Sequence, residues 1–157
     1  MLRVSLLGDF AIQYDDVALK EVLTPRLQSL LAYLLLNRGV SQTRSHLAFI
    51  FWPDTSEAQA RTNLRNLLYQ LRRALPDADD YLDFDGQTLQ WRSDSKFSLD
   101  VNQFQELVAQ SKQGKKESLL QAVELYKGDL FPACYDDWIL PFRESLRESY
   151  TEILDSI

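Results

Sequence analysis

Short runs in which apolar and polar residues alternate open the chain. "LRVSLLG" and "FAIQY" are separated by Gly8-Asp9, and "VALK" follows a second pair of turn residues. Alternation over about four to eight residues is typical of half-buried strands, and glycine and aspartate favour the turns between them. The pattern predicts three short antiparallel strands.

From Thr24 onward the apolar residues recur at helical spacing. Thr24-Pro25 has the form of an N-cap followed by a first helical residue, so we expect a buried helix over 25–38. "TRSHLAFIF" predicts a second, shorter helix. Pro53 should end it, because proline disfavours helical geometry in the residue before it.

The stretch "ARTNLRNLLYQLRRAL" has a sharply two-sided pattern. "SEAQ" immediately before it has the form of a capping box, in which serine and glutamine each satisfy a free backbone amide, so we expect a third helix over 57–75. One face of this helix is apolar and predicts a core stripe: Ala60, Leu64, Leu67, Leu68, Leu71 and Leu75. The outward face is rich in arginine and amide side chains and has no acid between residues 60 and 75.

A hairpin is predicted after the third helix. "YLDF" and "QTLQW" flank Asp85-Gly86, and an Asp-Gly pair between two strand-like runs is a strong signal for a tight turn. Strands, three helices and a hairpin follow one another in the order of a winged helix-turn-helix.

The remainder of the chain has the pattern of amphipathic helices. We expect one helix after Asp100 as N-cap, a second over "ESLLQAVELY" and a third from Pro141. No stop signal follows Ile157, so the chain is expected to be a fragment of a longer protein or to dock its last helix on a partner. The predicted fold is mainly α with small antiparallel β elements, divided into domains at 1–97 and 98–157.

Composition is that of a globular protein. The chain has 157 residues, 45% of them hydrophobic, and can bury a real core. A single cysteine and the lack of a secretory pattern at the N-terminus predict a reducing, cytoplasmic setting. The longest apolar run, Leu30–Leu36, is far shorter than the roughly 20 residues that cross a bilayer, so no membrane segment is expected.

Charge is distributed unevenly along the chain. Its formal net charge is −6, yet the first 75 residues hold nine lysines and arginines against six acids, a balance of +3. Residues 76–157 hold eight against seventeen, a balance of −9. Because a nucleic acid responds to charges within about 8 to 10 Å, the local basic face matters more than the average.

The outward residues of the third helix are of the types that read DNA. Arginine pairs with guanine, asparagine and glutamine pair with adenine, and arginine or tyrosine bind phosphates. The candidates are Arg61, Thr62, Asn63, Arg65, Asn66, Tyr69, Arg72 and Arg73.

The predicted wing is acidic, which is unfavourable beside phosphates. It carries two basic residues, Arg92 and Lys96, against five acids: Asp77, Asp79, Asp80, Asp83 and Asp85. Either the tip points away from DNA with only Gln87, Thr88 or Arg92 in reach, or the third helix supplies most of the binding.

No enzymatic chemistry is predicted. His46 and Cys134 form no metal-ligand spacing or nucleophile–base pair, and none of the five glycines belongs to a phosphate-cradling loop. We expect no catalytic site, metal or cofactor.

Several motifs resemble one family of bacterial regulators. "LRVSLLGDFAI", "LLAYLLLNRG", "HLAFIFWPD" and "ARTNLRNLLYQLRRAL" resemble the OmpR-type winged-helix domain of the antibiotic-regulatory-protein (SARP) class. "DVNQFQELV" and "AVELYKGDLFPACYDDWILPFRESLRE" resemble the bacterial transcriptional activator domain that follows it, a TPR-like helical domain that normally continues with further helices.

The resemblance implies a sequence-specific, DNA-binding transcriptional activator. The third helix would enter the major groove with Arg65 and Arg72 as the best candidates, and Arg44 would hold a phosphate. Tandem copies would bind direct repeats of double-stranded DNA, and Trp52, Asp54 and Thr55 would meet RNA polymerase. Self-association on DNA or through the helical domain is a further expectation, as is a cytoplasmic, nucleoid-associated location.

One alternative stays open from the residues. The winged helix could have lost DNA binding and serve, with the acidic helical domain, as a protein–protein interaction module.

Overall fold

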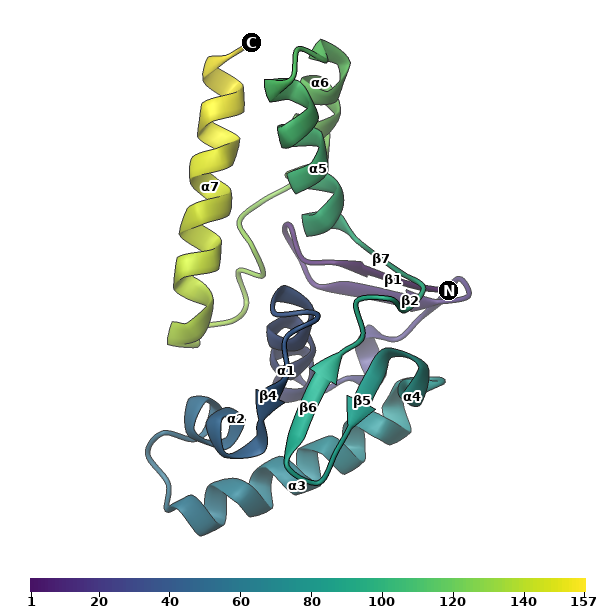
Figure 1. Ribbon diagram of the computed structural model, residues 1–157, viewed down its shortest axis with the longest axis vertical. Helices are drawn as coiled ribbons and strands as arrows, with labels where there is room; N and C mark the ends of the chain where they lie inside the picture. The colour runs from purple at the N-terminus through teal and green to yellow at the C-terminus, as the bar shows by residue number, and fades with distance from the viewer. The chain divides into compact units, whose positions relative to one another are not determined.

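The N-terminal strands pair with a strand from much later in the chain. In the computed structural model, which describes Met1–Ile157, β1 (Leu2–Ser5), β2 (Ala11–Tyr14) and β3 (Val17–Ala18) form the expected antiparallel meander. β7 (Phe97–Leu99) lies parallel to the other side of β1 (Figure 1). The order of the sheet is β3-β2-β1-β7. This sheet is therefore mixed rather than wholly antiparallel. A parallel pair needs a long crossover, and residues 19–96 supply it.

The chain divides into two compact units, one of residues 1–18 with 97–157 and the other of residues 19–96. The chain passes from one unit to the other between residues 18 and 19 and again between residues 96 and 97. The first 18 residues join the C-terminal helices, because β1 pairs with β7 and because the turn after β1 is hydrogen-bonded to the loop at residues 129–131. Gly8 N donates to Asp129 O at 3.0 Å, and Phe131 N donates to Leu6 O at 2.7 Å.

The unit of residues 19–96 contains the helices and hairpin that the sequence predicts. Thr24 and Ser56 cap the first and third helices by accepting from the backbone amides three residues on, as expected. The elements are η1 (Lys20–Val22), α1 (Pro25–Leu36), β4 (Gln42–Thr43), α2 (Arg44–Phe51), α3 (Glu57–Ala74), α4 (Ala78–Tyr81), β5 (Leu82–Phe84) and β6 (Thr88–Trp91). Strand β4 and helix α4 were not expected, because two and four residues are too short to show a period.

Helix α3 buries the stripe that its sequence predicts. Ala60, Leu64, Leu67, Leu68 and Leu71 are all buried. Only half of the capping box forms, because Gln59 does not reach back to Ser56: its side-chain amide donates to Asn63 Oδ1 at 2.8 Å, one turn further along. The hairpin β5–β6 is extended by β4, so that the sheet order is β4-β6-β5.

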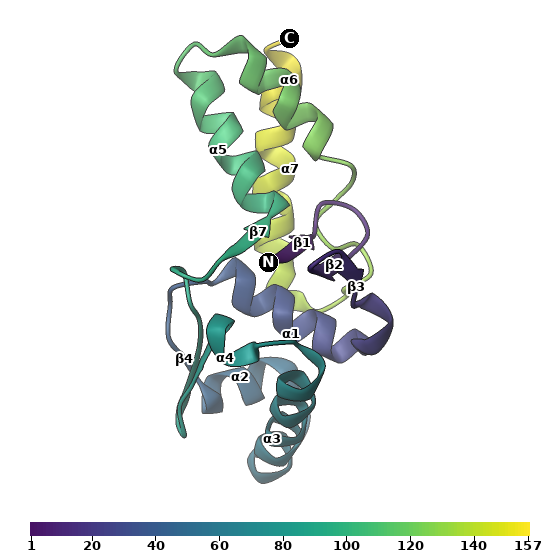
Figure 2. The same cartoon turned by 90° about the vertical axis from the view of Figure 1, so that its right-hand side faces the viewer.

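The other unit adds three helices to the first sheet. They are α5 (Asp100–Lys112), α6 (Lys116–Leu125) and α7 (Leu140–Asp155), the last preceded by η2 (Asp137–Ile139). α6 contacts both α5 and α7 (Figure 2). Aromatic side chains pack between these helices. The ring centroid of Phe104 lies 5.5 Å from that of Tyr126, and the Tyr126 ring stacks on the Tyr150 ring with 4.1 Å between centroids. None of the protein's helices combines the length and apolar character that crossing a membrane requires.

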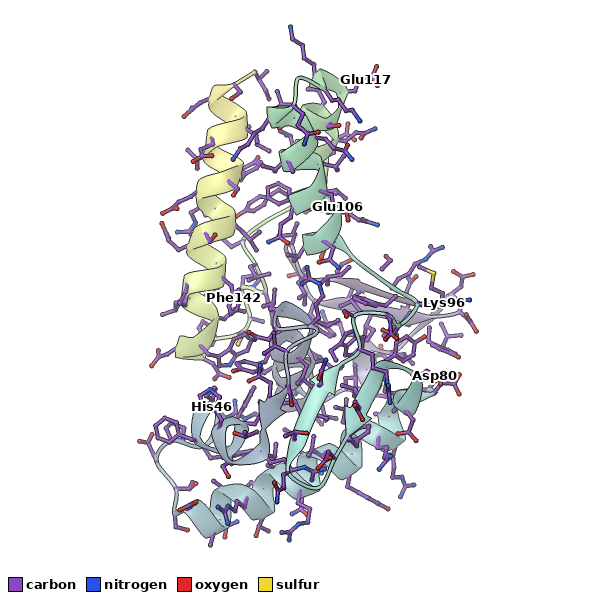
Figure 3. The ribbon with its side chains drawn as sticks, in the orientation of Figure 1. His46, Asp80, Lys96, Glu106, Glu117 and Phe142 are labelled. Carbon is purple, nitrogen blue, oxygen red and sulfur yellow. The ribbon has the colours of Figure 1, made fainter.

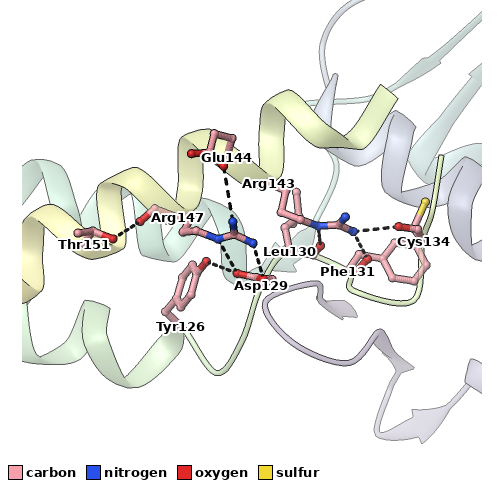
Figure 4. A network of polar contacts seen from close by, with 9 residues as sticks. All are labelled: Tyr126, Asp129, Leu130, Phe131, Cys134, Arg143, Glu144, Arg147 and Thr151. Carbon is pink, nitrogen blue, oxygen red and sulfur yellow. Dashed lines mark hydrogen bonds and ion pairs between the residues drawn. The ribbon is translucent and has the colours of Figure 1, made fainter. Parts of the chain in front are cut away.

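The loop between α6 and α7 is held by polar contacts (Figure 4). Arg147 pairs with Asp129 at 2.6 Å, and this hydrogen-bonded guanidinium lowers the pKa of the Asp129 carboxyl. Burial and the neighbouring Asp129 carboxylate raise the pKa of Tyr126 to about 12. The Tyr126 hydroxyl therefore keeps its proton and donates to Asp129 at 3.2 Å.

Asp100 has a different role from the expected N-cap. Leu99 occupies the N-cap position of α5, and the Asp100 carboxylate instead accepts from the backbone amides of Leu6 at 2.8 Å and Leu7 at 2.9 Å. The side chain is buried, and this burial raises the pKa of Asp100 although the amide bonds oppose the shift. A carboxylate thus joins the start of α5 to the β1–β2 turn.

The raised pKa of Asp100 predicts a specific pH dependence. The pKa of the Asp100 carboxyl is higher in the folded protein than in the unfolded chain, so the folded state binds the proton more tightly. The contribution of Asp100 to the free energy of unfolding therefore falls as pH rises from the unfolded toward the folded pKa. The stability of the wild type minus that of Asp100→Asn should therefore be largest at acid pH and decline toward neutrality. Urea unfolding of both proteins from about pH 4 to about pH 7 measures it. A difference that grows with pH would contradict the assignment.

Candidate nucleic-acid interface

The polar side of α3 is open to solvent. Asn63 is half-buried, and the other candidates on this helix are exposed: Arg61, Thr62, Arg65, Asn66, Tyr69, Arg72 and Arg73. Because the apolar stripe faces the core of its unit, these side chains necessarily share the outward surface.

Three of the four arginines on α3 already have partners within the protein. Arg61 pairs with Glu57 one turn earlier, at 2.8 Å. Arg73 donates to the Tyr69 hydroxyl at 3.0 Å. Arg72 is held twice: it pairs with Asp79 of α4 at 2.7 Å, and its guanidinium carbon lies 4.3 Å from the centre of the Phe84 ring.

Two of the remaining polar side chains bond within the helix. The Thr62 hydroxyl donates to the carbonyl of Ala58 at 3.1 Å, and Asn63 accepts from Gln59. Arg65, one of the two best candidates from the sequence, makes no hydrogen bond or ion pair with the protein.

A hollow of about 480 Å³ lies where Arg65 projects. It is formed by the start of α2, by α3 and by the tip of the β5–β6 hairpin, and we call it the basic hollow. Its lining residues are Thr43, Arg44, Ser45, Arg61, Leu64, Arg65, Gly86, Gln87 and Thr88. Three of them are arginines and none is acidic.

Strand β4 fixes the walls of the basic hollow. Gln42 and Thr43 pair with Leu89 and Thr88 of β6, and the backbone amide of Arg44 donates to the carbonyl of Gln87 at 2.8 Å. The hairpin tip is thereby tied to the first turn of α2. Sequence reasoning placed Arg61 and Arg65 along one flank of the third helix, but the position of Arg44 beside them depends on a two-residue strand pair that has no sequence signal.

Arg44 carries a buried side-chain donor. Its Nε atom is buried and has no hydrogen-bond partner within the protein. An unsatisfied buried donor costs free energy, so this N–H is best satisfied by an acceptor from outside the protein. The sequence did not identify Thr43, Ser45 and Gly86 as candidates, because nothing in it distinguishes them from ordinary turn residues.

The acidic residues around the hairpin are largely engaged. Asp79 pairs with Arg72, Asp83 lies 3.7 Å from Arg92, and Asp85 accepts from the backbone amide of Gln87 at 3.0 Å. Asp80 is exposed on α4 (Figure 3). Of these acids, Asp79 is neutralised by α3 itself, through Arg72.

The turn between α2 and α3 is ordered by its neighbours. Trp52 is half-buried and lies 5.3 Å from the Arg26 guanidinium, which also donates to the carbonyl of Phe51. The Thr55 hydroxyl donates to the carbonyl of Trp52 at 3.1 Å, and Asp54 is exposed.

His46, on α2, is exposed as well (Figure 3), and no group of three or more histidines, cysteines or acids is placed to hold a metal ion.

The order of the elements in residues 19–96 is that of a helix-turn-helix with a wing, within a mainly helical chain that has two small sheets. No known family model matches the sequence, and no curated protein matches it. Among solved structures, Mycobacterium tuberculosis EmbR, in complex with a low-affinity phosphopeptide, is similar at 21% sequence identity with a TM-score of 0.78. The likeness covers 97% of this chain and 43% of the EmbR chain. It shows a shared fold over nearly all of this chain and less than half of EmbR.

Proposed function

We propose that the protein is a sequence-specific DNA-binding regulator of transcription, of the SARP class. The observation that carries this proposal is the outward face of α3, on which exposed arginines and amides gather without an acid between residues 60 and 75. Two kinds of likeness support it: the motifs shared with that class, and the fold shared with EmbR.

In the proposed complex α3 enters the major groove of double-stranded DNA. Residues 1–97 form the OmpR-type DNA-binding part, with the contacts concentrated in α3 and at Arg44, and the TPR-like helices of 98–157 form the activator part. The proposed contacts are Arg44, Arg61, Thr62, Asn63, Arg65, Asn66, Tyr69, Arg72 and Arg73. The pairing of Arg72 with Asp79 means that this arginine must give up a salt bridge to reach a base.

The regulator is proposed to act as an activator in the bacterial cytoplasm. Tandem copies bind a direct repeat, and the turn with Trp52, Asp54 and Thr55 contacts RNA polymerase. The exposed Asp54 and the hydrogen bond that orders Thr55 support a turn of defined shape on the surface.

Selection of bound DNA from a random pool tests the proposal. The full chain should enrich one sequence element, and a probe with two copies of it should give two stepwise shifted bands. No measurable affinity at low salt would overturn DNA binding and favour the interaction module instead.

The dependence on salt gives a quantitative expectation. Phosphate contacts release counterions, so log Kobs should fall linearly with log salt, with a slope of about −0.9 for each phosphate neutralised. Engagement of several arginines predicts a slope steeper than about −3 for the selected element. Fluorescence anisotropy at several salt concentrations measures it, and a slope near zero would contradict arginine-driven binding.

A further inference from the structure

We propose that the groove between α5 and α6 is a docking site for a basic amphipathic helix of a partner protein. This groove, which we call the α5–α6 groove, lies within the unit of residues 1–18 and 97–157 and includes none of the proposed DNA contacts. The proposal therefore does not rest on the proposed function. Helix α5 lines the groove with Gln103, Glu106, Leu107 and Gln110. Helix α6 and the residues after it add Gln121, Glu124, Leu125 and Lys127.

The lining residues of each helix have the spacing of a helical ridge. On α5 and again on α6 they stand three and four positions apart, so each row follows one face of its helix. Two such rows side by side form a trough into which the side chains of a third helix pack. The Ser118 hydroxyl donates to the side-chain carbonyl of Gln110 at 2.9 Å and ties the start of α6 to α5. One end of the groove is thereby held in place before a partner binds.

The floor of the α5–α6 groove is apolar, and its walls are open. Leu107 and Leu125 are half-buried and remain partly accessible to solvent. The hollow measures about 650 Å³, but five of its eight lining residues are exposed, so a small molecule bound there would keep much of its surface in water. Small-molecule sites instead bury about 70% or more of the ligand surface. A helix suits the groove better, because its apolar face covers both leucines along its length.

Acidic side chains border the α5–α6 groove. Glu106 and Glu124 are exposed in its lining, and Glu117 lies one turn before Gln121 on the same face of α6. Figure 3 shows Glu106 and Glu117 on the side of these helices that faces away from α7. None of the three glutamates forms an ion pair within the protein, and Lys127 is the one basic residue of the lining.

The surrounding charge favours a basic partner. Residues 97–157 hold six lysines and arginines against eleven acids, a balance of −5. Lysine or arginine residues that flank the apolar stripe of a partner helix are attracted by this surface before contact, and they pair with the glutamates of the rim after it. An acidic or uncharged helix would gain only the contact with the two leucines.

A second copy of this chain does not offer such a helix. The basic helix of the chain is α3, and its apolar stripe is buried in the core of its own unit. Helix α7 leaves Leu154 partly exposed, but after Arg147 it carries three acids and no basic residue. These acids would face the glutamates of the groove, and like charges repel. The occupant is therefore assigned to another protein.

Selection from a displayed pool of random helical peptides, each about 16 residues long, tests the class of partner. The full chain should enrich peptides that have apolar residues three and four positions apart with lysine or arginine beside them. On titration with an enriched peptide, the backbone amide resonances of α5 and α6 should shift in the full chain. Enrichment of no peptide or of acidic peptides, or shifts confined to other elements, would overturn the proposal.

Charge reversal separates the groove from the acidic surface as a whole. Glu106→Lys and Glu124→Lys should each weaken binding of the enriched peptide about tenfold, because like charges then meet across the rim. Both residues are exposed, so the fold should tolerate the change. Glu148→Lys is the matched control: it makes the same change at an exposed position of α7 and should leave the affinity within about twofold of the wild type. Equal losses for all three variants would indicate general attraction to an acidic protein and overturn the site.

Two further measurements separate this proposal from its neighbours. In sedimentation of the full chain without peptide, a dimer that Glu106→Lys dissociates would overturn the assignment to another protein in favour of a second copy. Glu106→Lys should bind the selected DNA element as the wild type does. If the wild type binds no DNA, the proposed function is overturned and the peptide selection still decides the groove, whereas a failed selection leaves DNA binding standing.

Discussion

Replacing Arg143 with alanine should lower the free energy of unfolding by about 3 kcal/mol. Its guanidinium donates to three backbone carbonyls of the loop before α7, those of Leu130 at 2.8 Å, Phe131 at 2.6 Å and Cys134 at 3.0 Å (Figure 4). These bonds are partly buried, so truncation removes three donated hydrogen bonds at once in a place that water reaches poorly, although the Phe131 carbonyl still accepts from the Cys134 backbone amide. The same loop is bonded to the β1–β2 turn, which extends the damage to the sheet.

Urea unfolding of the full chain, followed by tryptophan fluorescence, measures this loss. Arg147→Ala is the matched control, because Arg147 lies on the same helix but makes exposed ion pairs with Asp129 and Glu144. Exposed pairs contribute little, so its loss should be clearly the smaller of the two. Arg143→Lys should recover only part of the stability, because an ammonium cannot reproduce the planar fork. Equal losses for Arg143→Ala and Arg147→Ala would contradict the role assigned to the three carbonyls.

Features that depend on neighbouring residues could be predicted from the sequence. The starts of α1 and α3 follow from Thr24 and Ser56, whose side chains satisfy amides three residues away. The tight turn at Asp85-Gly86 likewise places the hairpin β5–β6. In each case the signal and the structure that it specifies lie within a few residues.

Features that depend on distant partners could not be predicted from the sequence. Asp100 has the sequence context of an N-cap, but its carboxylate bonds amides at Leu6 and Leu7, more than 90 positions earlier. The grouping of the first strands with the C-terminal helices follows from the same long-range contacts. Nothing in a single sequence ranks a bond of this kind above a local cap.

The candidate site shows the same limit. Helical periodicity was enough to place every arginine of α3 on the outward face, since that depends only on the angle per residue. It could not tell Arg65, which has no partner, from Arg72, which is held by Asp79 and Phe84. This difference sets the expected effects of their substitution.

Arg65→Ala should weaken binding to the selected DNA element by about 1 to 3 kcal/mol, and Arg72→Ala by less. Arg65 has no protein partner to replace, so its whole interaction with DNA is lost on truncation. Arg72 must break a 2.7 Å salt bridge and leave the Phe84 ring before it can bind, which offsets part of what it contributes. Affinities of both variants for the selected element and for single-base variants of it, measured at one salt concentration, give the comparison.

The way in which the loss of affinity of Arg65→Ala varies among DNA sequences separates two roles for Arg65. If Arg65 clamps a phosphate, its removal costs the same binding free energy on every DNA sequence. It also makes the slope of log Kobs against log salt shallower by about one unit. A side chain that reads a base loses most on the best site and relaxes the preference at one position. Because Arg65 faces the hollow beside Arg44, we expect the uniform loss. A loss of affinity confined to one base position would place the Arg65 guanidinium in the groove and contradict its role as a phosphate clamp. A greater loss of affinity for Arg72→Ala than for Arg65→Ala would show that the Arg72–Asp79 pair opens at little cost on DNA.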